Sequence, residues 1–434
     1  KPVDPQTLLE VEGTLHDDKD VMKSILGEME DTDQNVEIVN SFDLAEDAID
    51  GDEAPIIKLL NVMLLQAIRE NASDIHIEAE ENVTRVRYRV DGELREAMHP
   101  PKRFHIAIVS RVKIMSDLDI AEKRAPQDGR MRLKIGDVAV DVRVSTLPSV
   151  YGEKVVLRVL QSGSSNLNIE DLGFTEQQIQ TYRSIVNRPY GIVLVTGPTG
   201  SGKTTTLYST LRFLNTMSKN IITIEDPVEY QMENINQIQV NRKAGIDFST
   251  GLKSILRQDP DIIMVGEMRD EETASVAIKA ALTGHLVLST LHTNDAPSCY
   301  ERLQAMRIAP YLLASAISGV IRQRLVKNIC TNCKVPCDPD VDSIRLMKLR
   351  TDVQYYKGEG CNQCGGTGLR GRSALYEILT PSQEVKKRIL TGNLIEGCEI
   401  PGFARMIDHG RIAIEAGITT AEEVLKVVRL QEVH

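Results

Sequence analysis

The chain contains no tryptophan, and aromatic residues make up only 4% of its 434 positions. Proteins that bind single-stranded nucleic acid stack its bases on aromatic side chains, and nucleic-acid binders in general present clustered positive charge. The formal net charge here is −11, so both features argue against a nucleic-acid partner. No apolar run approaches the length of a membrane-spanning helix, so we expect no direct insertion into a membrane.

Cysteine is also scarce. The chain has seven, which do not suggest the disulfide framework of a secreted protein, so we expect a reducing, cytoplasmic compartment. Four of them form two Cys-x-x-Cys pairs, which can fold into turns that together offer four thiolates. Such a site, with no open coordination position, predicts a structural Zn²⁺ held by Cys330, Cys333, Cys361 and Cys364. Cys337 could compete as a ligand, and the alternative is a set of unrelated reduced thiols.

Negative charge is concentrated at the start of the chain. Residues 1–54 contain 17 Asp or Glu and three Lys, a balance of −14, so the remaining residues sum to about +3 (−11 minus −14). We interpret residues 1–54 as a flexible acidic arm or linker. Because the sequence starts at Lys1 rather than Met, we expect this arm to be the remnant of a longer N-terminal region.

Hydrophobic periodicity predicts two domains after this arm. The first is a small α+β domain, in which an amphipathic helix ends near Asn71 and a hairpin turns at Asp91-Gly92. In the second, apolar strands alternate with helices, which is typical of a mostly parallel sheet covered on both faces. We therefore expect a multidomain α/β protein that consists of an α+β domain (55–160), a linker (161–168), a P-loop core (169–329), a four-cysteine insertion (330–369) and a helical C-terminal subdomain (370–434).

The stretch GPTGSGKTT matches the P-loop pattern and lies between an expected strand and an expected helix, as that motif must. Its glycines let several backbone N–H groups point at phosphate oxygens, and the helix N-terminus adds the positive end of a dipole. Lys203 is expected to reach the β and γ phosphates, and the Thr204 hydroxyl to join the shell of a Mg²⁺ ion. The predicted nucleotide contacts are Gly197, Pro198, Thr199, Gly200, Ser201, Gly202, Lys203, Thr204 and Thr205.

Acidic and histidine residues follow the next expected strands. Hydrolysis needs a held metal and an oriented water, and the carboxyl ends of parallel strands converge on the ligand crevice. The acidic candidates are Glu225, Asp226 and Glu229 after one strand and Glu267 after another, each with a structural role as the alternative. His285 and His292 flank a further strand; His292 is a candidate γ-phosphate sensor or, alternatively, a loop histidine with satisfied hydrogen bonds.

Four motifs in fixed order resemble the secretion ATPase superfamily, whose members are the motors of type II secretion and type IV pilus assembly (the GspE and PilB proteins). They are GPTGSGKTT (197–205), TIEDPVEY (223–230), RQDPDIIMVGEMRDEETA (257–274) and TGHLVLSTLHTND (283–295). SDIHIE (73–78) and DVRVSTLPSVYGEKVVLRVL (141–160) agree, so the resemblance covers about residues 55–380. It implies a PAS-like fold for the first domain and a RecA-like fold for the P-loop core. One departure is Ala125, where relatives usually carry Leu, and it bears on packing more than on chemistry.

This resemblance implies roles for the residues that match. It implies an enzyme that hydrolyses ATP with Mg²⁺, in which Glu229 is the general base and Asp226 supports it. Glu267 corresponds to the Walker B acid, aimed at Mg²⁺ and water. His285 and His292 form the family's His box.

The resemblance also implies four arginines at the site. Arg143 and Arg158, in the first domain, match arginines that reach the γ-phosphate when the domains close. Arg257 and Arg269 match arginines near the active site. An arginine delivered from a mobile domain would stabilise the charge of phosphoryl transfer and make hydrolysis depend on domain position. The alternative for Arg143 is a solvated strand face.

In biological terms, the resemblance implies a homo-hexamer that acts on a platform protein of the inner membrane and is peripherally associated with that membrane through its partners. Assembly motors usually carry the four-cysteine knuckle and retraction motors lack it, which favours extension or secretion. The Pro100-Pro101 stretch is more similar to pilus extension motors, so we predict type IV pilus assembly, with type II secretion as the alternative. Two further hypotheses are a nucleic-acid translocase or conjugation ATPase with a RecA-like core, and a nucleotide-gated scaffold without turnover.

Overall fold

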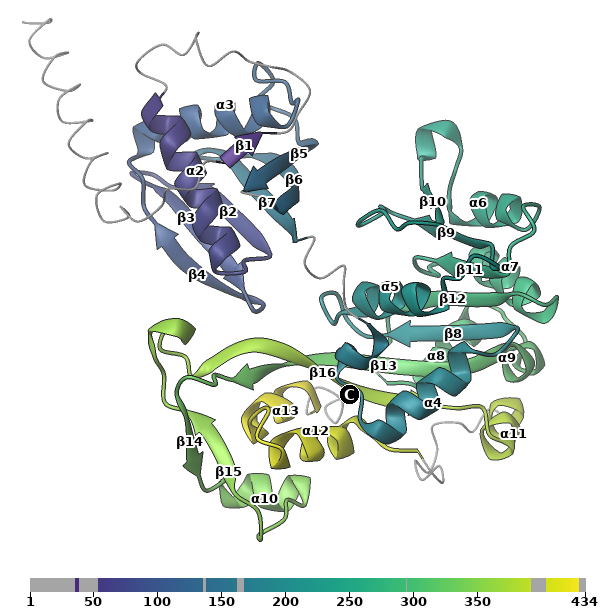
Figure 1. Ribbon diagram of the computed structural model, residues 1–434. Helices are drawn as coiled ribbons and strands as arrows, with labels where there is room; N and C mark the ends of the chain where they lie inside the picture. Colours follow the sequence, from purple (N-terminus) through teal and green to yellow (C-terminus); the bar gives the residue numbers. More distant parts are fainter. Residues whose placement is uncertain are drawn as a thin grey trace, which may run out of the picture. The chain divides into compact units, whose positions relative to one another are not determined.

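The computed structural model describes residues 36–38, 54–135, 138–161, 168–293, 295–391 and 403–428 (Figure 1). The chain separates into two compact units, Lys1–Ser162 and Gly163–His434, which we call the first and the second unit. Most of the expected acidic arm (1–54) and of the expected linker (161–168) lies outside the described residues. Within the described residues, no helix combines the length and the apolarity that crossing a membrane would require.

The first unit contains a seven-stranded sheet of order β1-β5-β6-β7-β2-β3-β4, in which every neighbouring pair is antiparallel. Its elements are β1 (Val36–Ile38), α2 (Ala54–Arg69), β2 (Asp74–Ala79), β3 (Thr84–Val90), β4 (Glu93–Met98), α3 (His105–Met115), β5 (Gln127–Ile135), β6 (Val138–Ser149) and β7 (Gly152–Gln161). The predicted hairpin joins β3 to β4, and its turn residues Asp91 and Gly92 have φ of 49° and 88°. Asp and Gly tolerate such positive angles better than other residues do.

The helices α2 and α3 pack their apolar sides on one face of this sheet. Leu59, Leu60 and Met63 of α2 are almost completely buried, in the helical spacing that the sequence predicts. The strands alternate accordingly, so that Val86 of β3 is buried while the neighbouring Arg85 and Arg87 lie on the other face. The face without helices therefore carries charged side chains.

The second unit is built around a seven-stranded sheet of order β10-β9-β11-β12-β8-β13-β16. The strands from β10 to β13 in that order pair in parallel, and only β16 runs antiparallel to its neighbour. Its strands are β8 (Gly191–Thr196), β9 (Ile221–Glu225), β10 (Asn236–Gln239), β11 (Ile262–Val265), β12 (Leu286–Leu291), β13 (Ile317–Ile329) and β16 (Leu369–Leu379). A separate two-stranded ribbon consists of β14 (Lys334–Cys337) and β15 (Tyr355–Gly358).

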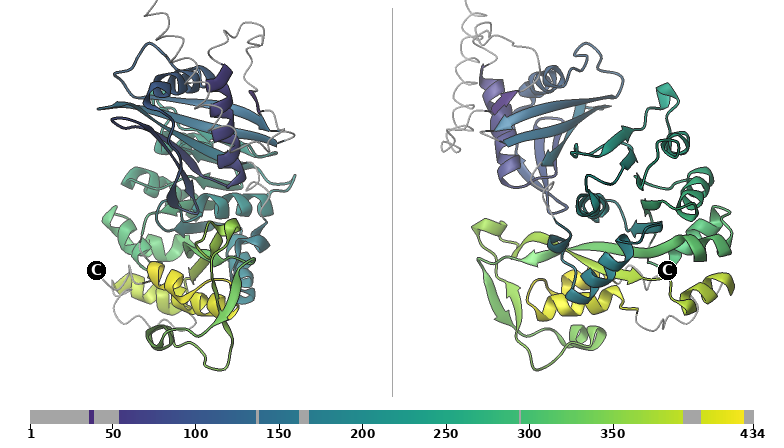
Figure 2. Two further views of the ribbon diagram at one scale, coloured as in Figure 1. Left: turned by 90° about the vertical axis from the view of Figure 1, so that its left-hand side faces the viewer. Right: turned by 45° about the vertical axis from the view of Figure 1, so that its right-hand side comes forward.

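Helices cover both faces of this sheet, as the two views of Figure 2 show. On one face lie α4 (Glu176–Val186) and α5 (Lys203–Leu214), against strand residues such as Val193 and Val195. On the other lie α6 (Phe248–Ile255), α7 (Glu271–Leu282), α8 (Ser298–Ala305), α9 (Pro310–Ala316) and α11 (Gln383–Thr391). The central strands are buried on both sides, which is why they read as continuous apolar runs in the sequence.

The C-terminal part differs from the expected division at residue 370. Residues 369–379 form β16, an edge strand of the main sheet, rather than the start of a helical subdomain. The physical reason is that the run ALYEIL can be buried against β13 over most of its length. Further helices lie in this part of the chain: α10 (Val341–Met347) within the four-cysteine segment, and α12 (Met406–Glu415) and α13 (Ala421–Val428) after β16. They form a separate small core with Val326 and Leu375 at the far end of β13 and β16.

Candidate functional site

The P-loop connects β8 to α5, as the sequence predicts. Gly197, Gly200 and Gly202 have φ of 149°, 78° and 87°, which side-chain-bearing residues rarely adopt. Gly202 is the N-cap of α5, so the first N–H groups of the helix face the loop without intrahelical partners. The loop is therefore a ready anion site at the carboxyl edge of the sheet.

Lys203 lies over this loop. Its Nζ donates hydrogen bonds to the carbonyl oxygens of Gly197 and Pro198, at 2.9 and 2.8 Å. Burial lowers the pKa of Lys203 to about 8, and the nearby carboxylate of Glu267 opposes that shift. The ammonium group is thus held where phosphate oxygens are expected, and it faces a negative side chain across the site.

Glu267 is the centre of a polar cluster at the end of β11. Its Oε1 pairs with Arg269 Nη2 at 2.6 Å, and its Oε2 lies 3.7 Å from His292 Nε2. Burial and the positive charge of Lys203 lower the pKa of His292, while Glu267 opposes the shift. Four predicted residues, Lys203, Glu267, Arg269 and His292, are therefore close enough to interact electrostatically.

The acids after β9 lie in different surroundings. Glu225 is buried and accepts hydrogen bonds from Tyr208 of α5, Thr223 and Gln237. Burial raises the pKa of Glu225, although these hydrogen bonds oppose the shift. The backbone N–H of Glu229 donates to the same tyrosine oxygen at 3.2 Å. Glu225 thus links β9 to α5 from within the protein.

Asp226 is more exposed. Its Oδ2 lies 3.4 Å from Arg242 Nη2, and its peptide bond to Pro227 is cis. Its charge also raises the pKa of Arg269, after the larger effects of Glu267, which places it near the Glu267 cluster. The structure therefore brings Asp226 to the site's edge through Arg269.

Two predicted residues lie away from this cluster. His285 precedes β12 and is therefore at the amino edge of the sheet, opposite the P-loop, where its Nδ1 lies 2.9 Å from the carbonyl oxygen of Ala280. The guanidinium of Arg257 donates to Lys253 O and Ser254 Oγ of its own helix end. Their nucleotide-binding roles stay predictions.

Sequence reasoning missed residues that hold the strand ends together. Thr293 and Thr196 share a 2.7 Å contact between their Oγ1 atoms, which ties the end of β12 to the end of β8. Gln323 of β13 accepts a 2.7 Å hydrogen bond from Thr206 Oγ1 of α5. A polar residue inside an apolar strand pattern was the available signal for Gln323, but the flanking Arg322 and Arg324 make the local pattern hard to read.

The first unit contains the other two predicted arginines. Arg130, Arg143 and Arg158 are cross-strand neighbours, and Asp74 and Arg89 continue the same row across the sheet. Asp74 is buried, and its Oδ1 accepts from Arg158 Nε at 2.9 Å. Since the side chain of Arg158 is 63% exposed, its remaining guanidinium N–H groups face outward. Sequence reasoning missed the anchoring role of Asp74.

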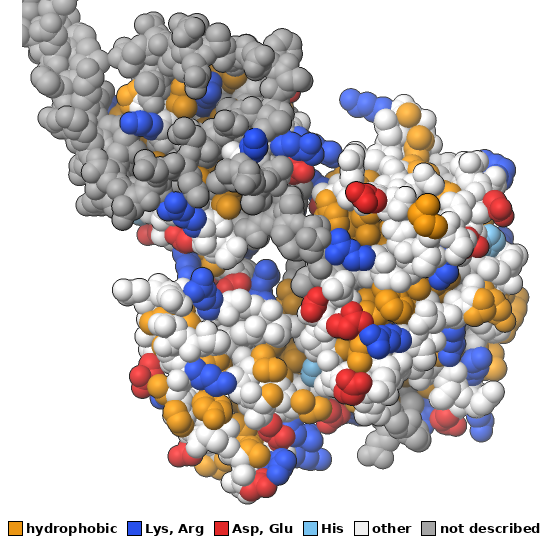
Figure 3. Space-filling model, viewed as in Figure 1, with side chains coloured by type: hydrophobic (Ala, Val, Ile, Leu, Met, Phe, Trp, Pro, Cys, Tyr) orange, Lys and Arg blue, Asp and Glu red, His pale blue; other side chains and the backbone are white. Residues whose placement is uncertain are grey.

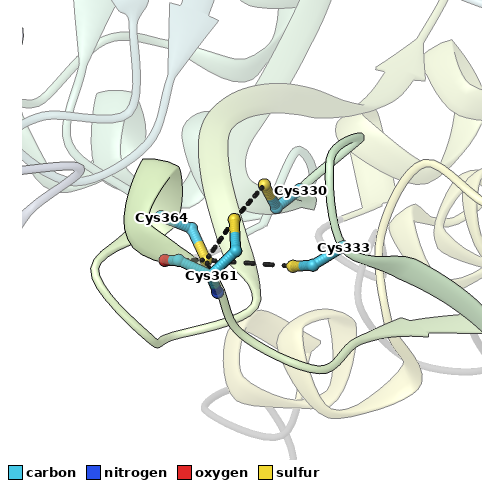
Figure 4. Close-up of side chains that lie close together, drawn as sticks. All are labelled: Cys330, Cys333, Cys361 and Cys364. Carbon is cyan, nitrogen blue, oxygen red and sulfur yellow. Dashed lines mark hydrogen bonds between the residues drawn. The ribbon is translucent and has the colours of Figure 1, made fainter.

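The four predicted cysteines come together (Figure 4). Cys330 and Cys333 follow β13, while Cys361 and Cys364 precede β16, and all four Sγ atoms lie within 4.8 Å of one another. Sγ–Sγ distances of 3.7 to 3.9 Å match the roughly 3.8 Å edge of a tetrahedron with Zn–S bonds of about 2.3 Å. Cys337 is not in this group.

Backbone N–H groups point at the sulfur atoms. Gly360 N donates to Cys333 Sγ at 3.3 Å, and Cys361 N and Gly368 N donate to Cys364 Sγ at 3.1 and 3.2 Å. Although burial opposes ionisation, these donors help to hold the pKa of the Cys364 thiol at about 6. The thiolate, which is the form that binds metal, is therefore favoured at Cys364, whereas burial raises the pKa of the Cys333 thiol to about 11.

On the face of the second unit visible in Figure 3, basic and acidic side chains are interspersed rather than gathered into patches of one sign. A duplex footprint would need clustered positive charge. This view thus offers no support for the translocase alternative.

Comparisons with known proteins agree with these motifs. The family model described as "Type II/IV secretion system protein" matches residues 50–426. The type II secretion system protein E of Dickeya dadantii is 49% identical over 394 residues, which cover 89% of this chain and 78% of that protein. The type IV pilus assembly ATPase PilB of Thermus thermophilus is 47% identical over 382 residues, 86% of this chain and 43% of that protein.

A solved structure of the pilus retraction motor PilT with bound ADP has a TM-score of 0.59 and 26% sequence identity, and the match covers 84% of this chain and 95% of that one. One conclusion follows from the family match, the relatives and the polar cluster beside the P-loop, which we call the P-loop cluster (Lys203, Glu267, Arg269 and His292). The chain belongs to the type II/IV secretion system protein family and is an ATPase of the kind that serves type II secretion and type IV pilus assembly.

Proposed function

We propose that the chain is a hexameric cytoplasmic motor that hydrolyses MgATP at the P-loop and drives extension of a type IV pilus through an inner-membrane platform protein. The observation that carries the catalytic part is the grouping of Lys203, Glu267, Arg269 and His292 at one edge of the sheet. The similarity to PilB supports the pilus assignment. Type II secretion is the second candidate, favoured by the similarity to protein E.

In this proposal the chain's residues act in a definite order. ATP replaces the carbonyl groups of Gly197 and Pro198 as the partner of Lys203, so that the ammonium contacts the β and γ phosphates. Thr204 and Glu267 supply oxygen ligands of the type that Mg²⁺ prefers, and the ion would neutralise developing charge when bound. Glu229 accepts the proton of the attacking water, with Asp226 in support. The neutral imidazole of His292 donates to the terminal phosphate.

The first unit would contribute arginine charge. We assign it as the mobile PAS-like module of the motor, whose Arg143 and Arg158 reach the γ-phosphate when the ring closes. Arg158 suits this task because Asp74 holds its Nε while the rest of the guanidinium stays exposed. Closure of the ring and cleavage of the γ-phosphate would then depend on each other, so that hydrolysis would be converted into movement.

The four cysteines would hold a structural Zn²⁺ ion. The sulfur distances and the donated N–H groups fit this ion, and four protein ligands leave no open position for catalysis. The site would fix β14, β15 and the start of β16 relative to β13, a segment too small to fold alone. In this proposal the zinc ion is purely structural and has no part in the reaction.

Phosphate release tests the catalytic proposal. Purified chain should hydrolyse MgATP, and Lys203→Ala should lower turnover by at least about a hundredfold, because it removes a charge that binds the transferred group. The matched control is Lys219→Ala, an exposed lysine just before β9 and therefore at the opposite edge of the sheet. Undiminished turnover in Lys203→Ala would remove Lys203 from its role, and stimulation by DNA would favour the translocase.

The biological assignment needs a separate test. In a host that lacks its pilus extension ATPase, the chain should restore surface pili, and in a host that lacks its secretion ATPase it should fail to restore export. The reverse pattern would favour type II secretion. Restoration of neither, with active and correctly folded enzyme, would contradict both assignments.

A further inference from the structure

We infer that Gln323 of β13 is a positioning residue that clamps the P-loop in its phosphate-binding shape, acting with Thr206 of α5. The inference rests on the proposed binding of ATP at this loop. No motif in the sequence marks either residue, and they lie 117 positions apart. Their meeting is a property of the fold.

The position of Gln323 is the first observation. On β13, Arg322 pairs with Thr196, the last residue of β8, so Gln323 lies level with Gly197, the first residue of the loop. Ile321 and Leu325, two residues away on either side, belong to the apolar core under α4 and α5. A glutamine here interrupts an apolar row, and it is only 2% exposed. Burying an amide costs free energy unless its polar atoms are satisfied, so the site must use them.

The second observation is the direction of the side-chain amide. Oε1 accepts from Thr206 Oγ1 at 2.7 Å, so the amide oxygen faces α5. Nε2 must then point the other way, and it lies against Gly202: a Cβ atom on that glycine would come within 2.7 Å of it. Gln323 therefore joins the first turn of α5 to the residue that caps this helix.

The third observation concerns the start of the loop. A Cβ atom on Gly197 would lie 2.5 Å from the backbone oxygen of Gln323. One residue thus contacts both ends of the P-loop, through its carbonyl at Gly197 and through its amide at Gly202. A Cβ atom on Gly200, at the tip of the loop, would meet nothing within 4 Å, so glycine is favoured there only because φ is positive. At Gly197 and Gly202 the absence of a side chain therefore leaves the space that Gln323 occupies.

The consequence for function follows from geometry. The N–H groups expected to bind phosphate lie between these two contacts and in the first turn of α5 that follows, so their directions depend on how the ends of the loop are held. Without the clamp the loop would sample other shapes, and each ATP molecule would have to order it on binding. Loss of Gln323 should therefore weaken ATP binding more than it slows the chemical step.

The main test compares two buried glutamines. Gln323→Leu should raise the KM for ATP about tenfold, the size expected when one buried hydrogen bond is lost from a binding site, with kcat changed less than threefold. The control is Gln178→Leu, because Gln178 is also buried and donates to the backbone oxygen of Tyr376, the register partner of Gln323 on β16. It should lower the melting temperature without changing KM.

Thr206 gives a milder second test that survives if Gln323→Leu fails to fold. Thr206→Val keeps the shape and removes the hydroxyl, so KM should rise several-fold, whereas Thr206→Ser should keep KM within about twofold. The double variant Gln323→Leu/Thr206→Val should be no worse than Gln323→Leu alone, because both remove the same link. Additive losses would contradict the clamp.

The outcomes separate this inference from the proposed function. If Lys203→Ala hydrolyses ATP normally, the P-loop assignment fails, and the inference about Gln323 fails too. If Lys203→Ala is inactive but Gln323→Leu and Thr206→Val change only the melting temperature, as Gln178→Leu does, the clamp alone is overturned. A raised KM in both variants, with Gln178→Leu normal, supports it.

Discussion

The P-loop cluster and the four-cysteine cluster are built in different ways on the same sheet. The P-loop cluster gathers side chains that follow β8, β11 and β12, so its members come from residues 203 to 292. The four-cysteine cluster is made by two short turns at the outer end of one strand pair, β13 and β16. One site depends on sheet topology and the other on local spacing.

This difference has a physical consequence. In the P-loop cluster the partners neutralise one another without an ion, since Glu267 pairs with Arg269 and lies near Lys203 and His292. In the four-cysteine cluster every member is an acceptor once it is ionised, so a cation is needed to balance the charge. The first cluster should therefore keep its shape without ligand, whereas the second should lose it without metal.

The largest expected effect is on catalysis at the P-loop cluster. Glu267→Gln removes the charge that pairs with Arg269 and His292 and that would face Mg²⁺, so kcat should fall by roughly 10²- to 10³-fold in phosphate-release assays. Glu272→Gln, at an exposed acid whose partners are Lys253 and Ser249, is the matched control and should leave kcat unchanged. Turnover near the unmodified rate in Glu267→Gln would remove this acid from the site.

The second prediction concerns metal binding by the four-cysteine cluster. Elemental analysis of protein purified without chelators should find about one zinc per chain, and Cys364→Ser should reduce this to near zero and lower the melting temperature. Cys337→Ser is the control within the same segment, because Cys337 lies outside the group of four. Equal zinc loss in both variants would bring Cys337 into the site, and no zinc in the unmodified protein would contradict the assignment.

The same contrast explains how much could be predicted from the sequence. The cysteine pairs lie at fixed short spacing, so the sequence alone predicted that they meet. The P-loop was equally plain, because a glycine-rich turn between a strand and a helix has a local signature. The alternation of apolar strands with helices around the P-loop also followed from the periodicity of the sequence.

What escaped prediction depends on pairing between distant strands. The antiparallel edge strand β16 was not expected, because its sequence pattern does not reveal that its partner is β13. Gln323 and Thr293 were missed for the same reason, since their contacts come from the order of strands in the sheet. Asp74 is a comparable case in the first unit, where its partner Arg158 lies 84 residues away.

The smallest expected effect tests whether a third set of residues, from the first unit, joins the P-loop cluster. Asp74→Asn weakens the anchor of Arg158 Nε while keeping the shape of the side chain, so kcat should fall about fivefold to tenfold with little change in KM, because the arginine acts on the transition state. The control is Glu78→Gln, a second buried acid on β2, whose partners are Arg85, Arg87 and Lys154 instead.

The readings of this experiment are distinct because Arg158→Ala is measured beside it. If Arg158→Ala loses activity and Asp74→Asn follows it in part while Glu78→Gln does not, the buried acid positions the arginine. If Arg158→Ala is impaired and Asp74→Asn is normal, the arginine needs no anchor. If Arg158→Ala is itself normal, the first unit contributes no charge from β7 to hydrolysis, and the P-loop cluster is completed within the second unit.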